Sequence, residues 1–320
     1  MTAKHLPQTA ADKVFFKPVT ANYQPHPIPR LQNNPLISAL PRFPTKRSEL
    51  KAALNSLPDF SPEQRLAPRV IRKMQLAQLS RFFVGLPRVC ELSEYFYAVM
   101  CEGYVGREPN TAAANTILQQ LYDCQQLGKY CSLGRVENTA QFCSALTGMP
   151  GTGKSFTLTT IAQMYPPIIH HPEYDIWQIP TLYIEMAYNG ASLATLAQAI
   201  ITEIAKRYPP GDYERLYLRS RANAEQQLLA AFALIHIHRV GIVIVDESQN
   251  RDYEFEDIAE NPRRKKKAVR QSPLATLLIT ASNRLQVPLL LAGTSELEQV
   301  LGSRLSKTRR LAGMPHWGPL

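Results

Sequence analysis

The chain of 320 residues has only five cysteines and lacks any long uncharged hydrophobic run. The cysteines are odd in number and show no Cys-x-x-Cys spacing, which argues against a zinc site and favours reduced thiols in a cytosolic protein. No apolar stretch reaches the roughly 20 residues that a membrane span needs, and no secretory segment follows Met1. The adjacent His170 and His171 lack the i, i+4 spacing of a helical metal pair. We therefore expect a cytoplasmic chain with no membrane partner.

The sequence also lacks a repeat of fixed period, a recognition-helix pattern and a zinc finger, so we expect no readout of DNA bases. What it has is an excess of positive charge, with 36 Lys and Arg against 26 Asp and Glu and a net charge of +10. Such an excess favours a polyanionic partner. The apolar fraction of 45% is that of a globular protein, and the length allows one large domain with appendages.

The most specific pattern is the run Gly-Met-Pro-Gly-Thr-Gly-Lys-Ser, which matches the phosphate-binding loop G-x-x-x-x-G-K-[ST] at every required position. The apolar segment 141–147 before it predicts a buried strand, and residues 156–164 after it predict a helix. A helix N-terminus that follows such a turn directs backbone N–H groups at an anion. We expect Lys154 to reach the β- and γ-phosphates and Ser155 to ligate Mg²⁺. The predicted nucleotide-binding residues are Gly148, Met149, Pro150, Gly151, Thr152, Gly153, Lys154, Ser155 and Phe156.

A second element predicts that the bound nucleotide is also hydrolysed. A continuous β-branched run ends in Asp246 and Glu247, as expected of a central parallel strand whose carboxyl end faces a ligand. We expect Asp246 to hold Mg²⁺ through its water shell and Glu247 to orient and deprotonate the attacking water. A third predicted strand, 287–294, should lie beside this one and end in Thr294, which would contact the γ-phosphate or its water. Ser295 is the second choice for that role, or a helix cap.

The chain divides into three predicted parts. Residues 1–60 are proline-rich and predict an extended, irregular arm. Residues 61–102 predict a helical N-terminal block, with Ser61 as N-cap and Pro62 at the first helical position. Residues 103–320 alternate strands and helices, which predicts an α/β P-loop NTPase core with a parallel sheet flanked by helices. The expected strands are 141–147, 181–187, 241–247 and 287–294, and the expected helices are 111–126, 154–164, 192–207, 222–237 and 273–283.

Two basic regions could contact nucleic acid. One surrounds the end of the predicted helix 192–207, and the other is the run 263–267 after the Asp-Glu strand. Lys and Arg side chains neutralise phosphates and give affinity that is independent of sequence, so we expect double-stranded DNA as a partner and favour the first region. Its members are Lys206, Arg207, Arg215, Arg219 and Arg221. Further along, the segment 303–310 supplies candidates for an arginine finger that reaches a neighbouring subunit.

The order of these motifs resembles the AAA+ ATPases of the initiator type. It is more closely similar to TnsC, the AAA+ regulator of Tns-type and CRISPR-associated transposons. The resemblance spans about Asn34 to Trp317 and rests on more than the generic nucleotide motifs. The segments that carry it are Asn-Pro-Leu-Ile-Ser-Ala-Leu-Pro at 34–41, Arg-Val-Ile-Arg at 69–72, Gly-Tyr-Val-Gly-Arg-Glu-Pro at 103–109, Asp-Glu-Ser-Gln at 246–249 and Thr-Arg-Arg-Leu-Ala-Gly at 308–313.

The resemblance implies a bacterial protein that assembles with itself, as ATP-bound rings or helical filaments, on duplex DNA. Such an assembly links a target selector of the TniQ/TnsD kind to a TnsA/TnsB transposase, and ATP hydrolysis resets it. The expected cofactors are ATP and Mg²⁺. AAA+ proteins normally continue into a helical lid, and because this chain stops at Leu320 we expect the lid to be absent or truncated.

The resemblance also assigns individual residues. It implies that Tyr104, Val105 and Arg107 form the adenine-side turn. It implies that Arg309 and Arg310 act on a neighbouring subunit's nucleotide. Loop and helix positions that contact DNA in relatives correspond here to Asn189, Lys206 and Arg207, although Asn189 stands where a lysine is expected.

Two other hypotheses stay open. A replication helicase loader would share all of the nucleotide chemistry, although the motifs at Asn34 and Tyr104 argue against it. A nucleotide-gated scaffold would bind ATP with little hydrolysis, and Glu247 argues against that. ATP is expected rather than GTP because the sequence has no Asn-Lys-x-Asp motif.

Overall fold

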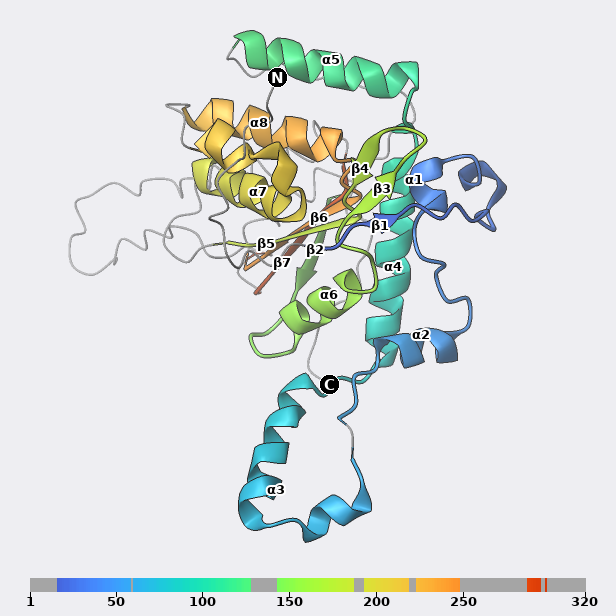
Figure 1. The fold of residues 1–320 in the computed structure, drawn as a ribbon, viewed down its shortest axis with the longest axis vertical. Helices are drawn as coiled ribbons and strands as arrows, with labels where there is room; N and C mark the ends of the chain where they lie inside the picture. The colour runs from blue at the N-terminus through green and yellow to red at the C-terminus, as the bar shows by residue number, and fades with distance from the viewer. Residues whose placement is uncertain are drawn as a thin grey trace, which may run out of the picture.

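The computed structural model describes residues 16–58, 60–127, 143–186, 193–218, 223–247 and 287–294, together with Leu297. Its centre is a four-stranded sheet in which every pairing is parallel (Figure 1). The strands lie in the order β2 (Cys143–Thr147), β7 (Leu289–Gly293), β6 (Ile242–Asp246) and β5 (Thr181–Glu185). The predicted α/β class with a parallel sheet is confirmed, and β7 lies beside β6 as expected.

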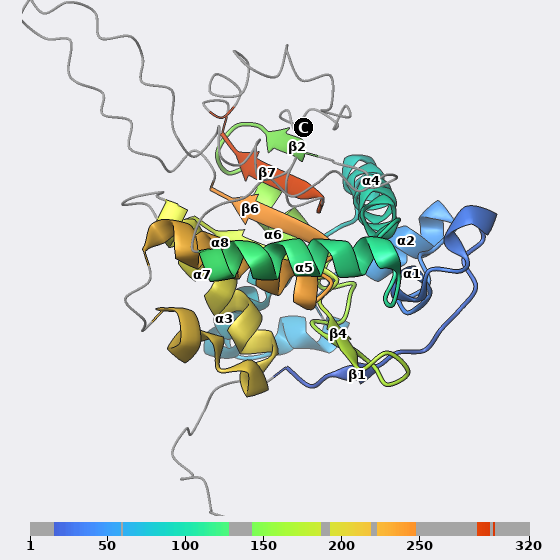
Figure 2. The same cartoon turned by 90° about the horizontal axis from the view of Figure 1, so that it is seen from above.

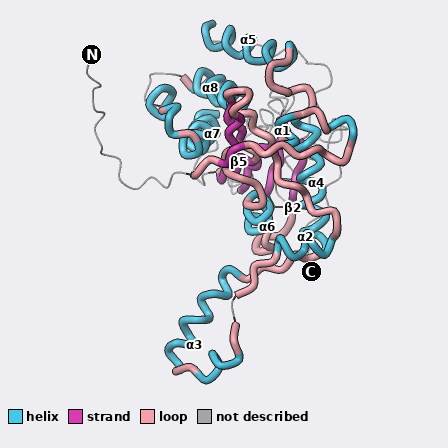
Figure 3. The backbone as a smooth tube through the Cα atoms, turned by 45° about the vertical axis from the view of Figure 1, so that its right-hand side comes forward, coloured by secondary structure: helices cyan, strands magenta, loops and turns pink. Residues whose placement is uncertain are grey.

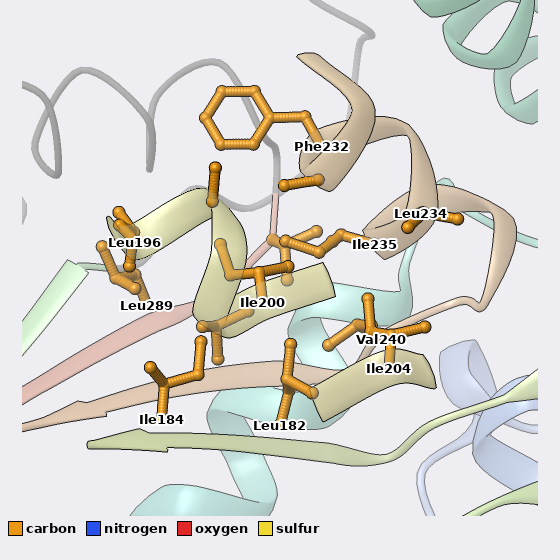
Figure 4. Packing of buried hydrophobic residues seen from close by; sticks show 14 of the residues in the cluster. Leu182, Ile184, Leu196, Ile200, Ile204, Phe232, Leu234, Ile235, Val240 and Leu289 are labelled. Atoms are coloured by element: carbon orange, nitrogen blue, oxygen red, sulfur yellow. The ribbon is translucent and has the colours of Figure 1, made fainter. Parts of the chain in front are cut away.

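Each strand contributes to two separate cores, because successive side chains in a strand face opposite sides of the sheet. On one face, Leu182 and Ile184 of β5 and Leu289 of β7 belong to a single buried cluster. Figure 4 shows Ile200 and Phe232 among the side chains that pack over these strands. On the opposite face the alternate residues of the same strands belong to a second cluster. The two-sided burial explains why the strands read as continuous apolar runs.

Helices cover both faces of the sheet (Figures 1 and 2). On the first face lie α7 (Leu193–Arg207) and α8 (Ala224–Ile237), and α5 (Ala112–Leu127) packs on α8. On the second face lie α6 (Lys154–Ala162) and α4 (Pro87–Tyr104). These helices confirm the predicted ones to within a few residues, and the expected helix 273–283 lies outside the described residues.

The N-terminal segment differs from the prediction. It holds a 3₁₀ turn η1 (Pro29–Leu31) and two helices, α1 (Pro35–Ser38) and α2 (Arg47–Leu54). Leu36 and Leu50 are buried in the cluster of the second sheet face, where α1 and α2 lie beside α4. The expectation of an extended, irregular arm is therefore wrong for residues 29–54, because the apolar side chains between the prolines find a core.

The next segment leaves the body of the molecule as a projection (Figure 3). It comprises η2 (Pro62–Leu66), α3 (Arg69–Gln75) and η3 (Leu76–Arg81), and none of their residues is buried. The helical block expected from residue 61 is present and is divided into these short elements and α4. Ser61 does not cap the backbone, however, because its hydroxyl donates to the Glu63 carboxylate.

Several smaller elements were not predicted. β1 (Val19–Thr20), β3 (Ile169–His171) and β4 (Ile176–Gln178) form a second, three-stranded sheet. After α7 come a 3₁₀ turn η4 (Pro209–Gly211) and a π-helical turn η5 (Glu214–Leu218).

Two further expectations concern the redox state of the cysteines and membrane-spanning helices. Cys90, Cys101 and Cys143 are reduced, whereas Cys124 is disulfide-bonded, so the expectation of reduced thiols throughout is wrong at Cys124. Among the described residues, no helix combines the length and the apolar character that crossing a membrane requires.

Candidate nucleotide-binding site

The phosphate-binding loop has the predicted strand–turn–helix geometry. β2 ends at Thr147, and α6 begins at Lys154. Between them, Gly151 and Gly153 have φ values of 75° and 82°, in the left-handed region where a side chain is strained. The Thr152 hydroxyl donates to the carbonyl oxygen of Met149 at 2.8 Å and so closes the turn. The free N–H groups at the start of α6 can therefore face an anion that enters above the loop.

Lys154 is folded back over the loop. Its Nζ donates to the carbonyl oxygens of Gly148 at 2.9 Å and of Met149 at 2.8 Å. The residue is only 8% exposed. Burial lowers the pKa of Lys154, and the nearby charges of Asp246 and Glu247 oppose that shift. The ammonium group is thus held beside the loop by neutral oxygens that phosphate oxygens could replace with stronger, charge-assisted bonds.

The acidic pair lies at the same edge of the sheet. Asp246 ends β6, is 2% exposed, and accepts the backbone N–H of Glu247 on its Oδ1 at 2.8 Å. Glu247 has a φ of 51°, a left-handed conformation that is uncommon for a residue with a side chain. Strained backbone of this kind is concentrated at functional sites. Thr294 follows β7, which lies between β2 and β6. Because the strands are parallel, the structure brings Lys154, Asp246 and Thr294 to one edge, as predicted.

The oxygen donors at this edge fit Mg²⁺. Ser155 supplies a hydroxyl and Asp246 a carboxylate, which are the hard ligands that Mg²⁺ prefers. In the part of the chain that the structure describes, no three His, Cys, Asp or Glu residues cluster as a metal cage. At the usual Mg²⁺ site of P-loop proteins, few protein groups act together with substrate phosphates.

One residue of the site was missed from the sequence. The hydroxyl of Tyr183, in the middle of β5, donates to Oδ2 of Asp246. Burial raises the pKa of Tyr183, and the bond to Asp246 adds to the rise. Tyr183 therefore holds one oxygen of the carboxylate that is expected to hold the metal. The only sequence signal was a tyrosine in an otherwise apolar strand, which also suits an ordinary core position.

The turn at Tyr104 is not beside the phosphate-binding loop. Arg107 Nη1 donates to the carbonyl oxygen of Val240 at 2.9 Å, just before β6 begins, and Gly103 packs against Pro288, just before β7 begins. These residues lie at the amino end of the strands, whereas the phosphate-binding loop follows the carboxyl end of β2.

The side chains of this turn are also enclosed. Arg107 and Tyr104 are both 0% exposed, and burial lowers the pKa of Arg107 to about 10. Val105 is half-buried against the core of the second sheet face. The structure therefore does not support the expected nucleotide contacts of Tyr104, Val105 and Arg107.

The same turn does contact another segment that the sequence analysis singled out. The Nδ2 of Asn34 donates to the carbonyl oxygen of Tyr104 at 2.8 Å and to Glu108 Oε1 at 3.1 Å. Its Oδ1 accepts the backbone N–H of Leu36 at 3.0 Å and caps α1. Asn34, 4% exposed, thus joins the N-terminal segment to the end of α4.

The residues predicted to contact DNA differ in their exposure. Lys206 and Arg215 have exposed side chains, each in an ion pair on its own element or loop. The side chain of Arg207 is only 11% exposed, donates to Glu203 at 2.9 Å, and lies 5.6 Å from the ring centre of Phe16. The structure therefore places Arg207 in an internal contact rather than on a DNA-facing surface. Asn189, Arg219, Arg221, Arg309, Arg310 and the basic run 263–267 lie outside the described residues.

The comparisons with known proteins agree with this geometry. The family model described as the AAA domain matches residues 137–301, which include the phosphate-binding loop and all four strands of the main sheet. No curated protein matches the chain.

Proposed function

Because this chain belongs to the AAA domain family, we propose that it binds and hydrolyses ATP with Mg²⁺ and, in its ATP-bound form, assembles on duplex DNA. The observation that carries the ATPase proposal is the convergence of Lys154, Asp246 and Glu247 at one edge of the parallel sheet. Lys154 and the acidic pair come from elements far apart in the sequence. Their meeting supports one reaction centre rather than three separate surface features.

The geometry suggests a role for each side chain. Lys154 exchanges its two carbonyl partners for β- and γ-phosphate oxygens, while the N–H groups of the loop hold the remaining charge. Bound Mg²⁺ supplies neutralisation of the phosphate charge, with Ser155 and Asp246 as the protein groups that hold it. Glu247 accepts a proton from water, the water oxygen attacks the γ-phosphorus, and the bond to the β-phosphate oxygen breaks to leave ADP. Thr294 would contact the γ-phosphate or the water.

The DNA part of the proposal rests on charge. The chain carries a net charge of +10, and the exposed Lys206 and Arg215 lie at the end of α7 and in the turn after it. Exposed cations of this kind can exchange an intrachain carboxylate for a DNA phosphate without reading the sequence. We further propose the TnsC-like role, in which the assembly links a target selector to a transposase.

What supports the TnsC-like role is the pair of distinctive motifs. The segments 34–41 and 103–109 resemble that family, and they contact one another through the side chain of Asn34. A generic nucleotide-binding core does not require this joint. The helicase-loader hypothesis has no such feature in its favour.

The test is to measure phosphate release and co-sedimentation with duplex DNA for the wild type and three variants. Lys154→Ala should abolish both, since the loop loses its cation. Glu247→Gln should keep ATP-dependent DNA binding and lower phosphate release by roughly 100-fold or more, since the general base is lost.

Glu185→Gln is the matched control, because Glu185 is an exposed carboxylate that ends the neighbouring strand β5. It should behave like the wild type. Phosphate release by Glu247→Gln at the wild-type rate would exclude Glu247 as the base. DNA binding that ignores ATP would remove the assembly part of the proposal.

A further inference from the structure

Tyr183 reaches the acidic site from the neighbouring strand. In the register of β5 and β6, Tyr183 lies opposite Ile244, so Asp246 is its diagonal neighbour two residues further along. An aromatic side chain can span that diagonal. Tyr183 and Ile244 contribute to the core on the sheet face that α6 covers, and α6 carries Ser155. The backbone register thus directs the Tyr183 hydroxyl toward Asp246, on the sheet face that α6 covers.

The hydroxyl takes part in a chain of hydrogen bonds at this point. It donates to Oδ2 of Asp246. The other carboxylate oxygen, Oδ1, accepts the N–H of Glu247. Asp246 is only 2% exposed, so water has little access to replace either bond. Both oxygens of the proposed metal-holding carboxylate therefore already accept hydrogen bonds from the protein.

We propose that Tyr183 is a positioning residue that competes with metal-bound water for Asp246, and so sets the Mg²⁺ concentration at which the site closes on ATP. The inference rests on the proposed Mg-ATP function and adds regulation to the same site. A carboxylate that holds Mg²⁺ through its water shell accepts hydrogen bonds from that water, as it does from the Tyr183 hydroxyl. The Tyr183 hydroxyl occupies one of the two acceptor positions of Oδ2, and a water proton directed at that position has to displace it.

The competition predicts the direction in which the half-saturating Mg²⁺ concentration should shift when the hydroxyl is removed. Removing the hydroxyl leaves Asp246 with a buried oxygen that lacks this donor, which makes metal-bound water a better partner by comparison. A hydrogen bond to a charged group is strong enough to change an equilibrium by roughly tenfold. Tyr183→Phe should therefore lower the half-saturating Mg²⁺ concentration by about tenfold. ATP affinity without Mg²⁺ should not change, because Tyr183 does not belong to the phosphate-binding loop.

The experiment follows the binding of a fluorescent ATP analogue, first in EDTA and then across a Mg²⁺ titration. Tyr165→Phe is the matched control: Tyr165 is buried in the same core, but it lies outside the metal-holding pair. It should titrate like the wild type. Thermal unfolding of each variant verifies the fold, and Tyr183→Met removes the hydroxyl with a different shape if the phenylalanine variant is unstable.

The outcomes separate the inference from the function on which it rests. A wild type that shows no Mg²⁺-dependent binding would overturn both. A wild type that responds to Mg²⁺, with a Tyr183→Phe curve that is unchanged or shifted to higher Mg²⁺, would overturn the competition alone. A shift to lower Mg²⁺ in Tyr183→Phe but not in Tyr165→Phe is the result we expect.

Discussion

Replacing Asn34 by alanine tests whether the N-terminal segment is part of the folded body. The side chain makes three hydrogen bonds, of 3.0 Å from Leu36 N–H, 2.8 Å to the carbonyl oxygen of Tyr104, and 3.1 Å to Glu108. Loss of an N-cap costs about 1 kcal/mol. Each of the other two bonds contributes about 1 kcal/mol or slightly more. Since the residue is only 4% exposed, water replaces them poorly, and we expect a total loss of about 3 kcal/mol.

The assay is urea unfolding followed by circular dichroism, compared with Asn33→Ala. Asn33 is the exposed neighbour, and its replacement should change the unfolding free energy by less than about 0.5 kcal/mol. Asn34→Asp keeps the cap acceptor but puts a carboxylate beside Glu108 and the Tyr104 carbonyl, so it should be no better than alanine at neutral pH. A loss at Asn34→Ala as small as that at Asn33→Ala would refute the joint between the segment and α4.

Two further predictions concern stability. Burial lowers the pKa of His238 from the ordinary 6.5 to about 4. Between pH 6.5 and pH 4 the imidazole is therefore protonated in the unfolded chain but not in the folded one. The free energy of unfolding accordingly falls as the pH drops through this range. Between pH 7 and pH 5 His238 should lower the free energy of unfolding by about 2 kcal/mol. Urea unfolding at the two pH values should show a smaller difference for His238→Gln than for the wild type. An equally large difference in the variant would mean that another group causes the pH dependence. Leu66 in the projection is 88% exposed and Leu50 is 1% exposed, so Leu66→Ala should be nearly neutral while Leu50→Ala costs roughly 3 kcal/mol. Similar losses at both positions would mean that the projection packs against the body.

The parts of the structure that the sequence predicted well depend on local patterns. The phosphate-binding loop needs glycine at positions with positive φ, and Gly151 and Gly153 have such values. The strand that ends at Asp246 had to be buried on both faces, and all five of its residues are buried. Requirements of this kind can be recognised from a few adjacent residues.

The parts that the sequence missed depend on contacts between distant segments. At the Tyr104 turn, Gly103 packs against Pro288 just before β7, and nothing near Tyr104 in the sequence indicates that neighbour. In the N-terminal segment the many prolines led to the prediction of an irregular arm, and the amphipathic pattern of α2 was missed. Leu50 and Leu54 lie one helical turn apart, and both are buried. Tyr183 was missed because its role depends on the register of β5 against β6.

The central claim is that ATP bound at this site drives assembly on DNA. Electron microscopy of the chain with duplex DNA and Mg²⁺, with and without a non-hydrolysable ATP analogue, tests it most directly. The account predicts ordered rings or filaments only when both DNA and the analogue are present. Monomers under every condition, or assemblies that form equally well without the analogue, would contradict it.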